Sequence, residues 1–304
     1  GNPAFKAAGA TLIAHRDVPG LGLGEPRFSL LRPLLRQGFW MSFSGALMQL
    51  LLYADRFIIG AVLTLSSVAF YATPLDLIIR LWIIPVAVTQ TLLPAIASSF
   101  RELPQHTALL IRRGALIVMA LCLPASLVLI PSAELFLRLW LGEAFATGGG
   151  TVLRILGFGI FFSCLSFIPG VLLEAIGRPD VTAKFSLLLA AIFLPLSAAL
   201  LPWLGIEGAA LAWAARCVVD CLGRFWAAAW LYPEARGTMQ DLLKPVIPAA
   251  LGLALLVPLP GLLWPALLAA LIFGLVFAAG WSIAAAQDRA SVMALIRGKG
   301  RRSA

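Results

Sequence analysis

Residues 39–63 read FWMSFSGALMQLLLYADRFIIGAVL. This stretch is long enough to cross a bilayer as one helix, because about 20 mainly apolar residues span the hydrocarbon core. Hydrophobic residues make up 61% of the 304 residues and charged residues only 12%, whereas soluble domains have roughly 45–50% and 25%. The sequence therefore predicts an all-α, polytopic transmembrane helix bundle.

Seven further stretches have enough apolar residues to be spans, which brings the expected number to about eight. The eight are 39–63, 68–98, 114–130, 152–175, 185–204, 208–231, 245–259 and 263–286. They divide the chain into a cytoplasmic loop with an interfacial helix (1–38), a six-helix lobe (39–231), two additional membrane helices (232–286) and a basic cytoplasmic tail (287–304). The TGGGT at 147–151 is expected to be a flexible outer loop.

Lysine and arginine are distributed very unevenly among the predicted loops. One alternate set of loops holds 17 of the 23 basic residues and the other set holds one, Arg138. Because cytoplasmic loops carry the excess of positive charge, both ends of this chain are expected in the cytoplasm. The net charge of +9 then needs no nucleic acid to explain it.

The beginning of the chain is unlike that of a complete membrane protein. Position 1 is Gly, and the first 38 residues are mixed in character, with no charged segment leading into a cleavable apolar stretch. We expect the chain to be part of a longer polytopic protein.

Polar residues follow one face of the first predicted span. Gln49, Tyr53 and Arg56 belong to a series spaced three and four residues apart, which places them on one side of a helix. Such a stripe is expected to face protein or water, because an ionisable side chain facing lipid costs several kcal/mol.

Charges on the second span can neutralise those on the first. The turn between the two spans lies near residue 65, and residues equally far from it lie at similar depth. Arg56 is therefore expected to pair with Asp76, and Asp55 to contact Arg80. These pairs can serve transport, or they can only stabilise the hairpin.

The sixth span carries a series of charges four residues apart, namely Arg216, Asp220 and Arg224. With Arg56, Arg80 and Arg154 these give five deep arginines against Asp55, Asp76 and Asp220. A cavity lined in this way is cationic, and arginine is well matched to phosphate.

Motifs for other chemistry are missing from the sequence. The four cysteines lie in apolar runs and are expected to be buried thiols. No phosphate-binding loop, catalytic triad order or metal motif occurs, so no catalytic residue, metal ligand or cofactor is expected. A coupling cation, H⁺ or Na⁺, stays open.

Several short motifs resemble one known family. These are YADRFIIGAVLTLSSVAFYATPLDLIIRLWIIPVAVTQTLLPAIA (53–97), LWLGEAF (139–145) and AIGRPDVTAKFSLLLAAIFLPLSAALLPWLGIEGAALAWAARC (175–217). In order and position they are similar to the second half of polysaccharide flippases of the multidrug/oligosaccharidyl-lipid/polysaccharide exporter superfamily, which are MATE-like.

The resemblance implies a protein of two six-helix lobes around a central cavity. The spans here would be the second lobe followed by two extra helices, and the N-terminal lobe of the same protein would be a partner. The expected activity is the flipping of a lipid-linked oligosaccharide, of the undecaprenyl-pyrophosphate type, for surface polysaccharide biosynthesis.

Within that reading, the substrate-binding residues are expected to be Arg80, Arg216, Arg224, Gln49 and Tyr53. The supporting ion pairs are expected to involve Asp55, Arg56, Asp76 and Asp220. Three alternatives stay open: a cation-coupled multidrug exporter of the same superfamily, a membrane glycan polymerase or ligase, and an assembly partner without transport activity.

Overall fold

The computed structural model describes residues 53–259 and 263–283, together with Leu35, Gly38, Phe39, Ser42, Phe43, Gly45 and Ala46. The chain divides into two compact units, Gly1–Phe39 and Trp40–Ala304. Nearly all of the first unit, with its predicted interfacial helix, lies outside the described residues, as do the basic tail at 287–304 and Gln49.

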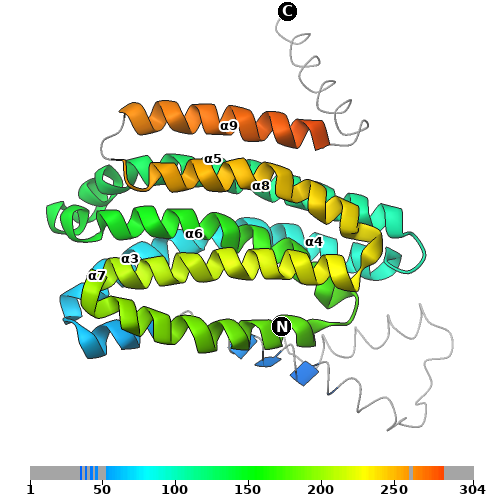
Figure 1. The fold of residues 1–304 in the computed structure, drawn as a ribbon, viewed down its shortest axis with the longest axis horizontal. Coiled ribbons are helices and arrows are strands. Elements are labelled where there is room, and N and C mark those ends of the chain that lie inside the picture. The colour runs from blue at the N-terminus through cyan, green and yellow to red at the C-terminus, as the bar shows by residue number, and fades with distance from the viewer. Residues whose placement is uncertain are drawn as a thin grey trace, which may run out of the picture. The chain divides into compact units, whose positions relative to one another are not determined.

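The described part of the second unit is helical. Its helices run in roughly the same direction or its reverse (Figure 1). After a helical segment at 53–62 come α3 (Leu65–Ile78), η1 (Ile79–Trp82), α4 (Ile83–Ser99), α5 (Pro104–Leu141), α6 (Glu143–Ala175), α7 (Pro179–Leu231), η2 (Pro233–Ala235), α8 (Arg236–Leu256) and α9 (Leu263–Ile283).

Five helical stretches among the described residues are long and apolar enough to cross a membrane. They are Leu65–Ser99, Pro104–Leu141, Glu143–Ala175, Pro179–Leu231 and Pro233–Leu256. The all-α, multi-pass fold class is thereby confirmed. The number of eight spans stays a prediction, since one of these stretches contains a break and part of the first predicted span lies outside the described residues.

Helix α6 forms the centre of the bundle. It packs against α3, α4, α5 and α7, and almost every side chain from Val152 to Leu173 is buried. The four cysteines lie buried and free in this core, which confirms that they act as small apolar side chains. Helices that contact protein on all sides must be apolar all round, and the low amphipathicity of the α6 sequence reflects this position.

Several helices extend into segments that the sequence assigned to loops. Helix α5 begins at Pro104 and α8 at Arg236, inside the predicted loops 99–113 and 232–244. The apolar run marks only the part of a helix that can lie in lipid, whereas polar residues at helix ends continue the same backbone hydrogen bonds.

The prediction that the TGGGT at 147–151 forms a flexible loop is wrong. Helix α5 continues to Leu141, a single residue follows, and α6 begins at Glu143, so that residues 147–151 are helical. A Cβ on Gly148 would lie 2.9 Å from Cδ2 of Phe70, and one on Gly150 only 2.6 Å from Cγ of Glu134. The glycines therefore allow close helix packing, as small residues commonly do in membrane bundles.

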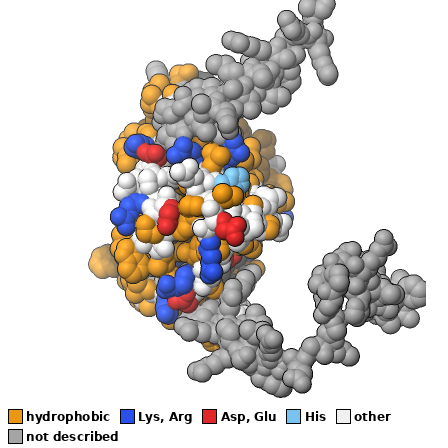
Figure 2. Space-filling view, turned by 90° about the vertical axis from the view of Figure 1, so that its right-hand side faces the viewer, with side chains coloured by type: hydrophobic (Ala, Val, Ile, Leu, Met, Phe, Trp, Pro, Cys, Tyr) orange, Lys and Arg blue, Asp and Glu red, His pale blue; other side chains and the backbone are white. Residues whose placement is uncertain are grey.

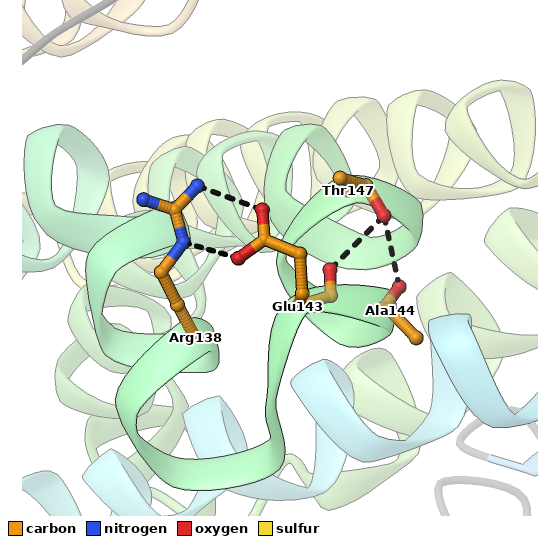
Figure 3. A network of polar contacts seen from close by, with 4 residues as sticks. All are labelled: Arg138, Glu143, Ala144 and Thr147. Carbon is orange, nitrogen blue, oxygen red and sulfur yellow. Dashed lines mark hydrogen bonds and ion pairs between the residues drawn. The ribbon is translucent and has the colours of Figure 1, made fainter.

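The turn between α5 and α6 is closed by polar contacts (Figure 3). The guanidinium of Arg138 donates from Nε to one oxygen of Glu143 at 2.7 Å and from Nη2 to the other at 2.9 Å. Both side chains are more than half exposed, and a surface pair of this kind contributes at most about 1 kcal/mol. The turn itself depends on Gly142, whose φ is 90°.

Helix α7 is broken at Gly205, as the predicted outer turn at 205–207 requires. The backbone there has φ 59° and ψ −146°, a conformation that essentially only glycine adopts. A Cβ on Gly208 would lie 2.8 Å from the carbonyl oxygen of Leu200, although eight residues of straight helix would separate them by about 12 Å. The chain therefore folds back, and we call residues 179–204 the first arm of α7 and 206–231 its second arm.

Charged side chains gather at one end of the bundle. Figure 2 shows this end, where the α4–α5 and α7–α8 connections of Figure 1 lie. The hydroxyl of Tyr232 donates to the carbonyl of Phe100 at 2.7 Å, and Asp241 on α8 lies 3.9 Å from Arg112 on α5. Two loops that the charge count assigned to the same side of the membrane therefore lie at the same end.

Candidate functional site

A pocket of about 380 Å³ lies between α4, α6 and α7. This volume is within the range of small-molecule pockets, roughly 300–1,000 Å³. Its lining mixes hydroxyl, amide and charged groups with apolar side chains. The lining residues are Gly45, Thr89, Gln90, Leu93, Ser166, Phe167, Gly170, Val171, Glu174, Pro179, Thr182, Ser186 and Arg224.

Arg224 is held in this pocket by both arms of α7. Its Nε donates to Oδ1 of Asp220 at 2.8 Å, one helical turn earlier on the second arm, and its Nη2 lies 3.4 Å from Oγ of Ser186 on the first arm. The Arg224 and Asp220 side chains are only 12% and 10% exposed. Because a buried charge is costly unless it is paired, this ion pair fixes where the guanidinium can lie.

Helix α6 leaves room for the same guanidinium. A Cβ on Gly170 would lie 3.3 Å from Nη1 of Arg224, which is tighter than ordinary contact. The glycine therefore lets the arginine reach the wall of the pocket that α6 forms. Ser166 and Glu174 lie one turn to either side of Gly170 and line the same wall.

The hydroxyl groups of the pocket have hydrogen-bonding capacity to spare. Thr182 is 92% buried, and among the described residues its Oγ1 has no hydrogen-bond partner. Thr89 donates to the carbonyl of Pro85 at 2.8 Å, and Ser166 to that of Ser163 at 2.9 Å, so both oxygens can still accept. Because an unsatisfied buried polar group is costly, the pocket is suited to a ligand rich in hydrogen-bonding groups.

The predicted charge series on α7 is only partly brought together. Asp220 contacts Arg224, as described, but the guanidinium of Arg216 lies over the ring of Trp213, 5.9 Å from its centroid. Arg216 lines a second, much smaller pocket with Asp55. Of the three charges in this series, Arg216 is therefore separate from Asp220, because it turns toward the 53–62 segment.

The predicted pair between Arg56 and Asp76 is confirmed by a salt bridge between their side chains. The guanidinium of Arg56 also lies 4.9 Å from the centroid of the Tyr53 ring. The tight turn at Thr64 explains this success, because it brings residues on either side of it to the same depth.

The predicted contact between Asp55 and Arg80 is wrong. Asp55 is buried and accepts a hydrogen bond from the hydroxyl of Tyr71 at 3.0 Å, whereas Arg80 lies exposed on η1. The carboxylate is thus partnered by a tyrosine hydroxyl and lies in a small pocket with Arg216, not with Arg80. Because the sequence reasoning paired only charged residues, it overlooked Tyr71.

Glu134 was also overlooked as a partner. It accepts a hydrogen bond from Nη2 of Arg154 at 2.7 Å, although the sequence placed it in an outer loop. Three of the five deep arginines, Arg56, Arg154 and Arg224, thus each contact a carboxylate. The expected excess of positive charge is smaller than the sequence suggested.

Of the five predicted substrate-binding residues, the pocket contains Arg224. Arg80, Arg216 and Tyr53 lie elsewhere among the described residues, and Gln49 lies outside them. The hydroxyl groups of the pocket were missed, although one signal was available. Ser166, Gly170 and Glu174 recur at every fourth residue, which places them on one face of α6.

Two comparisons with known proteins bear on this chain. Residues 23–148 match a family described as polysaccharide biosynthesis protein. The chain is also 29% identical over 197 residues to a Shigella flexneri protein named "Putative O-antigen transporter". That match covers 64% of this chain but only 45% of the relative, so the chain spans less than half of the relative's length. The matched residues are thus similar to a polysaccharide biosynthesis family and to a protein named as an O-antigen transporter, which agrees with the resemblance of the sequence motifs.

Proposed function

We propose that the complete protein moves a lipid-linked oligosaccharide across the bacterial inner membrane for surface polysaccharide biosynthesis. The substrate is of the undecaprenyl-pyrophosphate type. Its lipid tail stays in the bilayer while the sugar-pyrophosphate head crosses through a polar cavity, as the lobes of the transporter rock between two states.

The polar pocket beside Arg224 carries this proposal. An apolar bundle gains nothing in stability from hydroxyl, amide and carboxylate groups gathered around a cavity of about 380 Å³. Intramembrane polar groups that face a cavity commonly mark the path of a substrate. The matched family is described by polysaccharide biosynthesis and the relative by O-antigen transport, and both names fit a hydrophilic, saccharide-containing cargo.

A transporter is favoured over an enzyme for two reasons. The relative is named as a transporter. In addition, the described connections at the predicted outer side are the turns at Thr64, Gly142 and Gly205, which are too short to hold a sugar acceptor and catalytic groups.

The arrangement in the membrane belongs to the same proposal. The charged end of the bundle faces the cytoplasm, residues 39–231 act as one lobe, and an N-terminal lobe of the same protein supplies the other wall of the cavity. Arg224 contacts the head group within the pocket, and Arg80 and Arg216, which lie outside this pocket, contact the head group at other points of the cavity wall.

The first experiment deletes the complete gene in its host. Lipids are extracted and oligosaccharide-linked polyprenyl pyrophosphate is quantified by mass spectrometry beside surface polysaccharide. We expect the linked intermediate to accumulate at the cytoplasmic face and the surface polymer to fall. If neither quantity changes, the proposal fails. Accumulation at the outer face would instead indicate a polymerase.

Complementation then tests the arginines. We expect Arg216→Ala and Arg224→Ala to abolish transport while the protein still reaches the membrane, since each removes a charge that faces the head group. Normal surface polysaccharide with both variants would remove them from the site. Arg138→Ala is the control, because this arginine pairs with Glu143 at an exposed turn.

A further inference from the structure

We infer that the pocket between α4, α6 and α7 binds an uncharged sugar of the head group, and that it excludes acidic sugars and the pyrophosphate. This inference rests on the proposed function, because it names which part of the lipid-linked substrate the pocket takes. It follows from the balance of charge, the hydrogen-bonding groups and the space in the pocket.

The charges of the pocket do not favour an anion. Among the described residues that line the pocket, Arg224 is the basic one and Glu174 the acidic one. The Arg224 charge is already compensated by Asp220 at 2.8 Å. With Glu174 ionised, the three groups together carry one net negative charge, so a uronic acid or a phosphate would meet like charge. Such repulsion is strong where little water screens it.

The uncharged groups of the pocket fit a sugar instead. Thr89, Thr182 and Gln90 can each exchange hydrogen bonds with ring hydroxyls or an acetamido group, since hydroxyl and amide side chains both donate and accept. The aromatic ring of Phe167 lines the same cavity and can pack against the apolar face of a sugar ring. Arg224 uses its Nε to bind Asp220, so its Nη groups can donate hydrogen bonds to the neutral oxygen atoms of a sugar.

Thr182 carries a hydroxyl group without a hydrogen-bond partner beside the pocket. The side chain is 92% buried at the start of α7, and its hydroxyl has no hydrogen-bond partner among the described residues. A hydroxyl in such a position normally finds a partner. The oxygen itself is turned away from the cavity, but the side chain lines it, so rotation about χ1 would bring the hydroxyl to a sugar.

Binding assays with three lipids test the inference on the protein expressed from its complete gene and placed in nanodiscs. The probes are one polyprenyl pyrophosphate carrying N-acetylglucosamine, the same lipid carrying glucuronic acid, and the bare pyrophosphate lipid. We expect the neutral sugar lipid to bind more tightly than either of the others. Glu174→Gln should raise the affinity for the glucuronic acid lipid without weakening the neutral one.

Two matched threonines on α4 separate a ligand contact from a general effect on the helix. Thr89 and Thr91 both donate to a backbone carbonyl of their own helix at 2.8 Å, but only Thr89 lines the pocket. We expect Thr89→Val and Thr182→Val each to lower the affinity for the neutral sugar lipid by about tenfold, which corresponds to the loss of one hydrogen bond. Thr91→Val should leave the affinity unchanged, and none of the three should alter binding of the bare lipid.

Three results would contradict the inference in different ways. Tighter binding of the glucuronic acid lipid than of the neutral one would overturn the inference. An equal loss of affinity for all three lipids with Thr182→Val would also overturn it, because the pocket would then hold the pyrophosphate that the three share. In both cases the proposed function would stand. If none of the three lipids binds the wild-type protein, the proposed function fails and the inference fails with it.

Discussion

At the scale of single residues, the pair of Asp220 and Arg224 shows how a charge can be kept inside an apolar bundle. Both side chains are nearly buried, and Nε of Arg224 reaches the carboxylate at 2.8 Å. Removing one partner leaves the other as an unpaired buried charge, which costs about 3–5 kcal/mol in known cases. Removing both leaves no such charge.

This reasoning predicts a non-additive result. We expect Asp220→Ala and Arg224→Ala each to lower the thermal unfolding midpoint of the purified protein, and the double variant to be more stable than either. The polysaccharide phenotype should stay defective in the double variant, because the pocket still lacks its guanidinium. Unfolding shifts that simply add would show that the two residues are not coupled.

The sequence predicts such pairs only where the backbone fixes their depth. Arg56 and Asp76 were found because a turn of known position lies midway between them. Glu134 and Arg154 were not found, since the turn at Gly142 was hidden by the assumption that glycine-rich residues 147–151 form a loop. Neutral partners such as Tyr71 and Thr182 carry no charge pattern at all, so only the packed structure reveals them.

At the scale of elements, the two arms of α7 depend on one residue. Gly205 is the one residue of α7 with non-helical φ and ψ, and it allows the second arm to return beside the first. Ser186 and Arg224 come from different arms, so this turn also assembles the pocket.

We therefore expect Gly205→Ala to destabilise the protein, because a side chain at φ 59° and ψ −146° is strained by about 1–3 kcal/mol. The thermal unfolding midpoint in detergent measures the effect. Gly274→Ala is the matched control, since a Cβ there would meet nothing within 4 Å and alanine favours a helix. Equal midpoints for the two variants would show that the turn tolerates a side chain.

The helices themselves are the part of the fold that the sequence predicts best. Apolar runs locate the middle of α5, α6, α8, α9 and both arms of α7, because lipid and a packed core demand the same side chains. Their ends are predicted poorly, since polar residues such as Asp241 on α8 continue a helix beyond the apolar run.

At the scale of the whole molecule, the distribution of basic residues among the loops agrees with the end of the bundle at which the loops lie. Among the described residues, the basic loops 99–113 and 232–244 meet at the charged end of the bundle (Figure 2), and the three short turns at Thr64, Gly142 and Gly205 are the connections predicted for the other side. The structure contains no membrane, so which end faces the cytoplasm is a prediction from the positive-inside rule.

Single-cysteine labelling tests this orientation in the complete protein. We expect Ser66→Cys and Ala144→Cys to react with a membrane-impermeant maleimide in spheroplasts, and Glu102→Cys and Glu234→Cys to react only after the inner membrane is opened. All four positions are exposed. The protein without an introduced cysteine is the control, because the four cysteines of this chain are buried and this control measures labelling at any other cysteine. The reverse pattern would invert the topology.

The short turns at Thr64, Gly142 and Gly205 should protect this part of the chain from proteases on the periplasmic side of the membrane. Proteases cut exposed, extended loop tips, and a helix that ends at Leu141 and resumes at Glu143 offers no such substrate. In the proposed orientation, proteolytic shaving from the periplasm should leave residues 53–259 in one piece. For the same reason, these turns give an antibody or another protein on that side of the membrane no extended loop to bind.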